Sequence, residues 1–513
     1  MKKDQLNNNS ITNNKRIAQN TFLLYIRTFI TMIIALYTSR IVLQELGVED
    51  FGIYNVVGGF VGMFSLISAT LTSSTQRFIT FELGKKTNNH TQEVFSTAII
   101  IHISIALLII VLAESLGLWF LNEKMSIPIE RLNAANWVFQ FSLITFIINL
   151  ISIPYNSAII AHEKMAAFAY ISLIEASLKL SIAYTLKINI YDNLIVYGFL
   201  MLCTAIIIRF IYGFYCSRRF PESHFIFIKE KKYYKQILGF SGWNILGSSS
   251  VVLSNYGINV LLNLFFGVAT NAARGITNQV DNAINQFVSN FTMAINPQIT
   301  KAYASNNHSY MMKLVMLGSR YSFYLLLLIT LPILFETEYI LNLWLKNVPN
   351  YTIIFIRLSI CYTLCQSLSN TLYIAMLATG KIRNYQLVVG SLAIMSFPLA
   401  YIFFKLGLPP EFGYYATIII SISCLIARLI MLRGMIRISI RAFFKEVICK
   451  ICIVTPIASL IPFLITSIMP QGFKRLIFTV IITIISTSII IFIIGVSKEE
   501  RIYIIQQIKK KII

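Results

Sequence analysis

Nine basic residues lie inside the hydrophobic segments of this 513-residue chain, where a cation is costly. A cation at the centre of a spanning helix costs about 2.5 to 3.5 kcal/mol by membrane-insertion scales. Most of the nine must therefore pair, reach the lipid headgroups or line a wet cavity. A protein that keeps cations at such depth is expected to handle an anion there. The nine residues are Arg27, Arg40, Lys179, Arg209, Arg274, Arg320, Arg357, Arg428 and Lys450.

Depth in the segment separates candidate ligands from anchors. Arg27 lies about 13 Å into the first segment, counted from residue 18 at about 1.5 Å per residue, which is too deep to reach the headgroups easily. Its guanidinium is always charged and matches phosphate oxygens, so it is the first candidate for an anion site. Arg274 is the second, although it is close enough to a segment end to reach the headgroups. Four others are expected to be anchors at the headgroups: Arg40, Arg209, Arg320 and Arg428.

Two carboxylates lie deep in hydrophobic segments, where a proton or Na⁺ bound to them can be coupled to transport. Glu175 precedes Lys179 by four residues, which is the favourable order for an ion pair within a helix, so a neutralised structural pair is the preferred interpretation. Asp281 has no partner at that spacing and is the better candidate for ion coupling. Use of the membrane potential alone is the alternative.

The elements that position these residues are predicted from composition and hydropathy. With 56% hydrophobic residues, 12% charged residues and a mean hydropathy of +0.71, the chain is predicted to be an all-α integral membrane protein. The remaining Lys and Arg gather in alternate loops, which predicts cytoplasmic termini and explains the net charge of +22 without nucleic acid. About fourteen spanning helices are predicted, centred near 30, 61, 106, 145, 176, 204, 252, 284, 325, 362, 394, 422, 455 and 485.

An internal repeat relates the first six predicted helices to the next six. Residues 158–164 align with residues 375–381, and Gly47 and Val48 align with Gly267 and Val268. Two halves of equal orientation are typical of secondary transporters. The predicted division is a cytoplasmic tail (1–17), an N-terminal six-helix bundle (18–216), a basic cytoplasmic linker (217–236), a C-terminal six-helix bundle (237–433), two further spanning helices (434–496) and a cytoplasmic tail (497–513).

Three short motifs carry a family resemblance: the run Leu46-Gly47-Val48-Glu49-Asp50-Phe51-Gly52-Ile53-Tyr54-Asn55, Arg77 at the end of the second helix, and the turn Ala161-His162-Glu163-Lys164. With these motifs, the chain from about 15 to 496 resembles the bacterial polysaccharide-biosynthesis (O-antigen) flippases of the multidrug, oligosaccharidyl-lipid and polysaccharide exporter superfamily. The resemblance implies a V-shaped pair of bundles in the bacterial inner membrane. By alternating access, these bundles would translocate an undecaprenyl-pyrophosphate-linked oligosaccharide for lipopolysaccharide and other surface glycans. Other polysaccharide-assembly membrane proteins are a further class of partner.

Amide side chains occupy one face of each of two helices that line the central cavity in that fold. Asn244, Asn255 and Asn259 lie on the first, and Asn278, Asn282 and Asn285 share a face with Arg274 on the second. Hydrogen bonding between packed helices explains a single asparagine well, at about 0.6 kcal/mol each. Two such stripes together favour a hydrated lumen that accommodates a glycan.

Two alternative functions stay open. A membrane polysaccharide polymerase or ligase would need an outer catalytic platform, but the longest outer connection, about 336 to 350, carries only Glu336, Glu338 and Lys346 as charged residues. The histidines are not spaced as metal ligands or nucleophile partners, and the Cys449 and Cys452 pair stands alone, so no metal or cofactor is predicted. A multidrug antiporter for organic cations would favour carboxylates and aromatic residues over arginine in its lumen.

Overall fold

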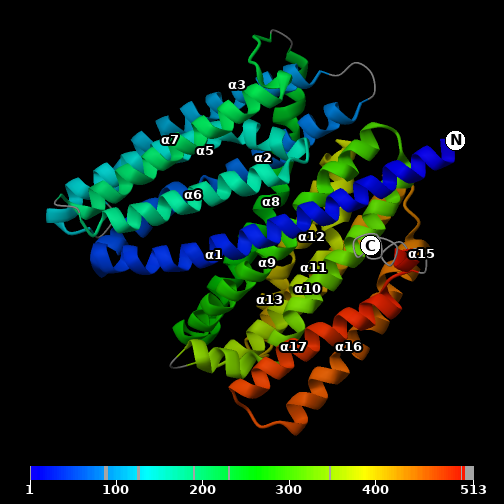
Figure 1. The fold of residues 1–513 in the computed structure, drawn as a ribbon. Helices are drawn as coiled ribbons and strands as arrows, with labels where there is room; N and C mark the ends of the chain where they lie inside the picture. The colour runs from blue at the N-terminus through cyan, green and yellow to red at the C-terminus, as the bar shows by residue number, and fades with distance from the viewer. Residues whose placement is uncertain are drawn as a thin grey trace. The chain divides into compact units, whose positions relative to one another are not determined.

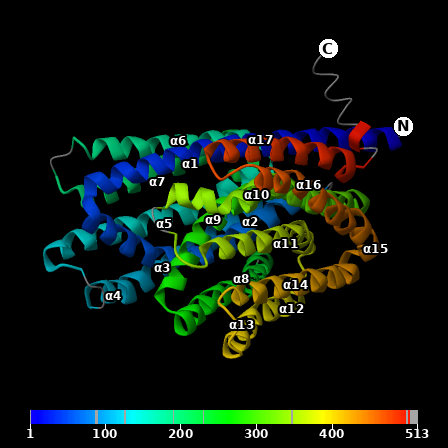
Figure 2. The same ribbon diagram turned by 90° about the horizontal axis from the view of Figure 1, so that it is seen from below.

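The computed structural model describes residues 2–85, 90–123, 127–188, 191–228, 231–345, 348–497 and 500–502, and every regular element within these ranges is helical (Figures 1 and 2). The prediction of an all-α protein is therefore confirmed. The first helix, α1 (Lys2–Gly62), begins in the segment predicted as an N-terminal tail. Most of the predicted tail 497–513 lies outside the described residues.

The first of two compact units comprises residues 1–248 and 300–307. In this unit α5 packs against α7, α2 and α3, and α6 packs against α1 and α7 (Figure 1). After α1, its helices are α2 (Ser65–Gly84), α3 (Thr91–Leu112), α4 (Leu118–Glu123), α5 (Leu132–Ala161), α6 (Met165–Thr185) and α7 (Asn193–Arg219).

The second unit comprises residues 249–299 and 308–513. Its central helix α10 packs against α11, α16 and α17, which Figure 2 shows beside one another. The helices are α10 (His308–Trp344), α11 (Thr352–Thr379), α12 (Arg383–Ile394), α13 (Ser396–Lys405), α14 (Phe412–Ile436), α15 (Ile440–Phe443), α16 (Cys449–Ile468) and α17 (Phe473–Ile490).

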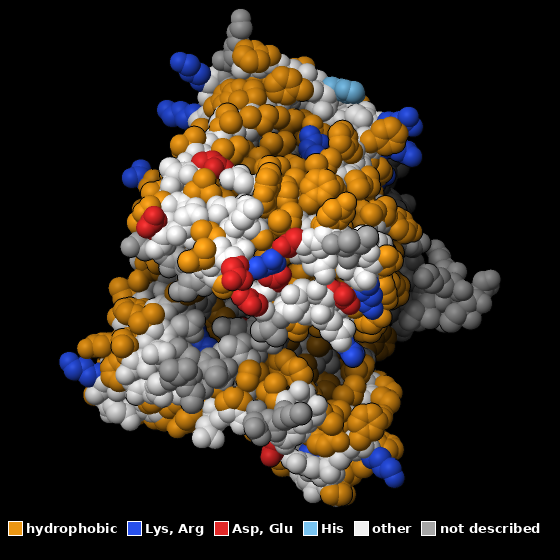
Figure 3. Space-filling model, turned by 90° about the vertical axis from the view of Figure 1, so that its left-hand side faces the viewer, with side chains coloured by type: hydrophobic (Ala, Val, Ile, Leu, Met, Phe, Trp, Pro, Cys, Tyr) orange, Lys and Arg blue, Asp and Glu red, His pale blue; other side chains and the backbone are white. Residues whose placement is uncertain are grey.

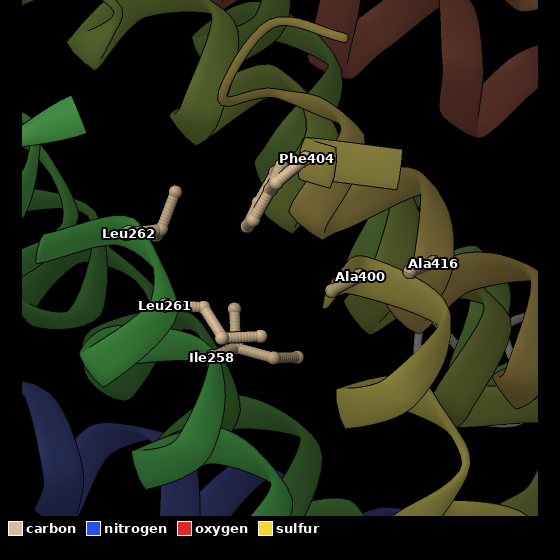
Figure 4. Close-up of a cluster of buried hydrophobic side chains, with 6 residues drawn as sticks. All are labelled: Ile258, Leu261, Leu262, Ala400, Phe404 and Ala416. Carbon is tan, nitrogen blue, oxygen red and sulfur yellow. The ribbon is translucent and has the colours of Figure 1, made fainter. Parts of the chain in front are cut away.

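Two long helices, α8 (Lys231–Phe266) and α9 (Val268–Ala304), contribute to both units. The later part of α8 packs its apolar face on α13 and α14 in a buried cluster (Figure 4). This cluster consists of Ile258, Leu261, Leu262, Ala400, Phe404 and Ala416. The units divide at Ser248, within α8, and the predicted bundle limits around the 217–236 linker remain a prediction.

Positions that the repeat aligns have similar backbone geometry. Gly47 breaks α1 with a φ of 74°, and Gly267 separates α8 from α9 with a φ of 80°. Glu163 after α5 has a φ of 59°, and its aligned residue Gly380 after α11 has a φ of 74°. Left-handed backbone is costly for residues other than glycine, so its recurrence at both aligned turns supports the repeat.

The number of spanning helices differs from the predicted fourteen. Within the described residues, twelve helices are long and apolar enough to cross a membrane, and a bent pair, residues 49–62 with 65–84, would make thirteen. The segment predicted near 284 is α9, whose 37 residues are long enough to span but too polar to count among the twelve. The asparagines predicted to contact the glycan lower the hydropathy of α9. The count of fourteen spanning helices is therefore not confirmed.

The outer surface is rich in large apolar side chains, as a lipid-facing surface requires. On the face drawn in Figure 3, hydrophobic side chains cover broad areas around a small group of acidic and basic ones. Among the side chains that are more than half exposed are Phe22, Leu36, Phe210, Leu253 and Leu460. Because such exposure would aggregate a protein in water, it supports the membrane assignment.

Candidate functional site

A cavity of about 430 Å³ lies in the first unit, between α1, α6 and α7. That volume is in the range of small-molecule binding sites. Its charged lining residues are Arg27, Glu175 and Lys179, and its hydroxyl and amide groups include those of Thr31, Thr38, Ser39, Asn55 and Ser172. The combination of polar groups and net positive charge is suited to an anionic, hydroxyl-rich ligand.

Arg27, the first candidate from the sequence, lines this cavity from α1. Its guanidinium carbon lies 4.9 Å from the ring centroid of Phe168, and its Nε is buried without a hydrogen-bond partner. Within the described part of the chain, no carboxylate forms an ion pair with it. A guanidinium beside a ring face in a polar cavity has the planar fork of donors that suits phosphate oxygens.

The predicted ion pair on α6 is present in the same cavity. Lys179 Nζ donates to Glu175 Oε1 at 2.6 Å, one helical turn apart, which confirms the interpretation from the i, i+4 spacing. Glu175 forms its ion pair with Lys179. Among the described residues, Arg27 is therefore the cation of this cavity lining that has no ion-pair partner.

Arg274, the second candidate, is packed inside the second unit and is only 5% exposed. Its Nη2 donates a long hydrogen bond of 3.5 Å to the Asn255 carbonyl oxygen, and its guanidinium carbon lies 5.4 Å from the Tyr414 ring centroid. Its Nε has no partner. The structure therefore does not bring Arg274 to the headgroups by snorkelling.

Asp281 lies two turns beyond Arg274 on α9, and its Oδ1 accepts a hydrogen bond of 2.8 Å from Thr363 on α11. Among the described residues, no ion pair joins Asp281 to a cation. The role of Asp281 in ion coupling stays a prediction.

The amide stripes differ in their burial. Three asparagines on α9 are exposed, as is Asn255 on α8, while Asn259 is half-buried. Asn244 is buried, at 1% exposure, in the part of α8 that belongs to the first unit. Its placement matches hydrogen bonding between packed helices. The role of the exposed stripe on α9 in lining a lumen stays a prediction. The three exposed residues on α9 are Asn278, Asn282 and Asn285.

A cluster that the sequence did not reveal joins three elements at one end of the first unit. Arg131, just before α5, forms ion pairs with Asp50 from α1 and with Asp192, the residue before α7. The Asp192 carboxylate also accepts from the backbone amides of Leu194 and Ile195 and so caps α7. Asp50 belongs to the motif of the family resemblance, and this was the feature of the sequence that could have pointed to the cluster. Arg131, however, lies 81 residues from Asp50 and 61 residues from Asp192 along the chain.

A first prediction concerns Asp192. Burial raises the pKa of its carboxyl, but the hydrogen bond from Arg131 and those from two backbone amides outweigh burial and hold the pKa below its usual range. Its ionised form therefore adds stability above the unfolded pKa of about 3.9, and this stability is lost as the pH falls through the lower folded pKa. Asp192→Asn keeps a helix cap but removes the charge. We expect a lower melting temperature at pH 7 and a smaller further loss at acid pH than in the wild type.

Melting curves of the purified wild type and Asp192→Asn in detergent, at pH 7 and below pH 4, measure the predicted difference in melting temperature. Asp192→Ala, which also removes the cap, should melt lower than Asp192→Asn at both values. An Asp192→Asn variant that loses as much melting temperature on acidification as the wild type would contradict the assignment.

The motif turn Ala161–Lys164 also forms a cluster. Glu163 is 4% exposed, and its carboxylate pairs with Lys301 at 2.7 Å and with Arg16 at 3.5 Å. Arg16 further donates to the His162 carbonyl oxygen at 3.2 Å. The turn therefore joins the start of α1 to the end of α9 within the first unit.

The prediction that Arg320 is a headgroup anchor is wrong, and Glu336, also in the second unit, has a partner that the sequence did not predict. Arg320, expected at the headgroups, is 2% exposed, and its Nη2 donates to both oxygens of Glu500 at 2.6 Å. Glu336, expected in an outer connection, lies at a kink of α10, where its φ is −105°, at 1% exposure, and it pairs with Arg475 at 2.9 Å. In both, a distant partner makes burial of the charge tolerable.

The overall fold matches solved transporters. MATE in the bent conformation superposes with a TM-score of 0.70 at 14% identity, over 84% of this chain and 96% of the other. The outward-facing conformation of a multidrug resistance MATE family transporter of the MOP superfamily gives 0.70 at 15% identity, over 83% and 96%. A MOP superfamily transporter from Pyrococcus furiosus gives 0.66 at 15% identity, over 83% and 96%. At these identities the likeness establishes the fold.

Sequence comparison identifies the family. No curated protein matches this sequence. A family model described as polysaccharide biosynthesis protein matches residues 17–303, more than half of the chain, and includes all three motifs of the resemblance. The chain therefore belongs to the polysaccharide biosynthesis protein family, with the fold of the MOP superfamily transporters.

Proposed function

We propose that this protein is a flippase that translocates a polyprenyl-pyrophosphate-linked oligosaccharide across the bacterial inner membrane by alternating access. The observation that carries this proposal is the guanidinium of Arg27, which has no ion-pair partner among the described residues, in a polar cavity of about 430 Å³. Arg27 would bind the pyrophosphate of this substrate. Family membership supports polysaccharide biosynthesis as the biological setting.

Two energy sources are compatible with this function. Moving a negative pyrophosphate outward from a negative interior gains about 2.3 kcal/mol per charge per 100 mV, so the membrane potential can drive transport directly. Asp281, which accepts a hydrogen bond from Thr363 and forms no ion pair among the described residues, is the better candidate for a coupled proton or Na⁺. Glu175 is the weaker candidate because Lys179 already neutralises it.

The test is expression of the wild-type chain in a bacterial strain that lacks its own O-antigen flippase. We expect surface glycan to return and the lipid-linked intermediate to stop accumulating on the cytoplasmic side. The same strain, made sensitive to ethidium by deletion of its efflux pumps, tests the alternative of a multidrug antiporter. Ethidium resistance without surface glycan, at a normal membrane level of the protein, would replace the flippase proposal with the antiporter.

A further inference from the structure

We infer that Tyr54 and Tyr197 form a stacking platform for a pyranose ring of the transported glycan, in the same cavity as Arg27 but far from it. The inference rests on the proposed function and assigns a sugar subsite within it. Both tyrosines line the cavity, and their ring centroids are 4.6 Å apart with an interplanar angle of 62°. In a T-shaped pair the edge of one ring covers one face of the other ring, and the opposite face of that ring is left free for a ligand.

The cavity is long enough to separate a phosphate site from a sugar site. Arg27 and Ser39 both line it from α1, and twelve residues of uninterrupted helix correspond to about 18 Å. Tyr197 lies one turn after Asn193, whose side chain donates to the Glu45 carbonyl oxygen at 3.1 Å. The platform is therefore near the Gly47 end of α1. The ring that it holds is not the sugar next to the pyrophosphate but one farther along the glycan.

The chemistry of this end suits a sugar. The face of an aromatic ring carries negative charge density and attracts the C–H bonds that cover one face of a pyranose. Hydroxyl groups of the sugar need polar partners, and the Thr38 hydroxyl is buried in the cavity lining without a hydrogen bond. Asn55, one residue after Tyr54, also lines the cavity. The Asn55 Nδ2 donates to the Phe51 carbonyl oxygen at 2.8 Å, which leaves its side-chain oxygen as an acceptor. An aromatic face beside hydroxyl and amide groups is the arrangement expected for carbohydrate.

Ion pairs and a hydrogen bond outside the cavity hold the helices that carry the two rings. Asp50 lies one turn before Tyr54, Asp192 lies five residues before Tyr197, and Arg131 pairs with both carboxylates. Together with the bond from Asn193 to Glu45, this fixes the start of α7 against α1. A platform fixed in this way loses little conformational entropy when a ring stacks on it.

The experiment measures binding of three probes to the purified full-length chain: farnesyl pyrophosphate, the same carrier with one N-acetylglucosamine, and the same carrier with a chain of three. We expect the three-sugar probe to bind the wild type about tenfold more tightly than the bare carrier. Tyr54→Ala and Tyr197→Ala should remove that increment and leave affinity for the bare carrier unchanged. Tyr54→Phe should keep the increment because it keeps the ring. Tyr37→Ala is the matched control, since Tyr37 pairs with Tyr184 at 3.0 Å between hydroxyl oxygens, away from the cavity lining.

The possible outcomes separate this inference from the proposed function. If the wild type binds none of the probes, the flippase proposal fails first. Equal affinity of the wild type for the bare and the three-sugar carriers would overturn the platform while leaving the pyrophosphate site in place. An increment that survives in both alanine variants would also overturn it. Loss of affinity for the bare carrier in these variants would assign the tyrosines a structural role instead.

Discussion

Replacing Arg27 with alanine is expected to reduce transport of the lipid-linked glycan by roughly 100-fold or more while the protein remains at its normal level in the membrane. A hydrogen bond to a charged group contributes about 1.5 to 3 kcal/mol, and a guanidinium can give two of them to one pyrophosphate. Loss of about 3 kcal/mol of that binding corresponds to roughly 100-fold. Because no carboxylate pairs with Arg27 in the described residues, its removal leaves no stranded charge and should not destabilise the fold.

Surface glycan and membrane abundance in a flippase-deficient strain measure this effect. Arg27→Lys should give an intermediate result, since lysine keeps the charge but loses the planar fork that matches phosphate. Arg40→Ala is the matched control, because Arg40 is exposed on the same helix and does not line the cavity. Full activity of Arg27→Ala would move the anion site elsewhere, first to Arg274.

The largest effect on stability is expected from Glu336→Ala, which should lower the free energy of unfolding by about 3 to 5 kcal/mol. Both carboxylate oxygens of Glu336 accept from Arg475 at 2.9 Å, and Oε1 also accepts from Thr479 at 3.0 Å. All three side chains are buried, so removal of the carboxylate leaves the Arg475 charge without a partner in an apolar interior. The pair also joins α10 to α17, and its loss should loosen the two C-terminal helices.

Titration with sodium dodecyl sulfate in mixed micelles gives the unfolding free energy. Glu338→Ala is the matched control two residues away, since Glu338 is exposed and accepts only a hydrogen bond of 3.1 Å from Gln471; its effect should stay within about 0.5 kcal/mol. The double variant Glu336→Leu with Arg475→Met should recover most of the loss, because it removes both charges together. A single variant as stable as Glu338→Ala would mean that the ion pair contributes nothing.

Features that depend on local spacing were predictable from the sequence. The Glu175 and Lys179 pair follows from four residues of helix, and Gly47 and Gly267 mark helix breaks because glycine adopts positive φ without strain. The depth of Arg27 follows from counting residues along one hydrophobic segment. These predictions needed no knowledge of which helices are neighbours.

Features that depend on partners far along the chain were not predictable. Glu336 and Arg475 are 139 residues apart, and Arg320 and Glu500 are 180 apart, so a single sequence shows each as a lone charge. A lone glutamate in a hydrophobic chain suggests a loop, which is why the sequence places Glu336 in a connection between helices. The cavity was missed for a similar reason, because Tyr54 and Tyr197 come from different helices and suggest nothing individually.

The left-handed backbone of Glu163 bears on the history of the two halves. The aligned residue in the second half is Gly380, which adopts the same turn without strain. A glutamate there costs roughly 1 kcal/mol or more, and the ion pairs with Arg16 and Lys301 offset that cost. If both halves descend from one duplicated ancestor, the turn in the first half has gained ion pairs, while the turn in the second half has kept a glycine.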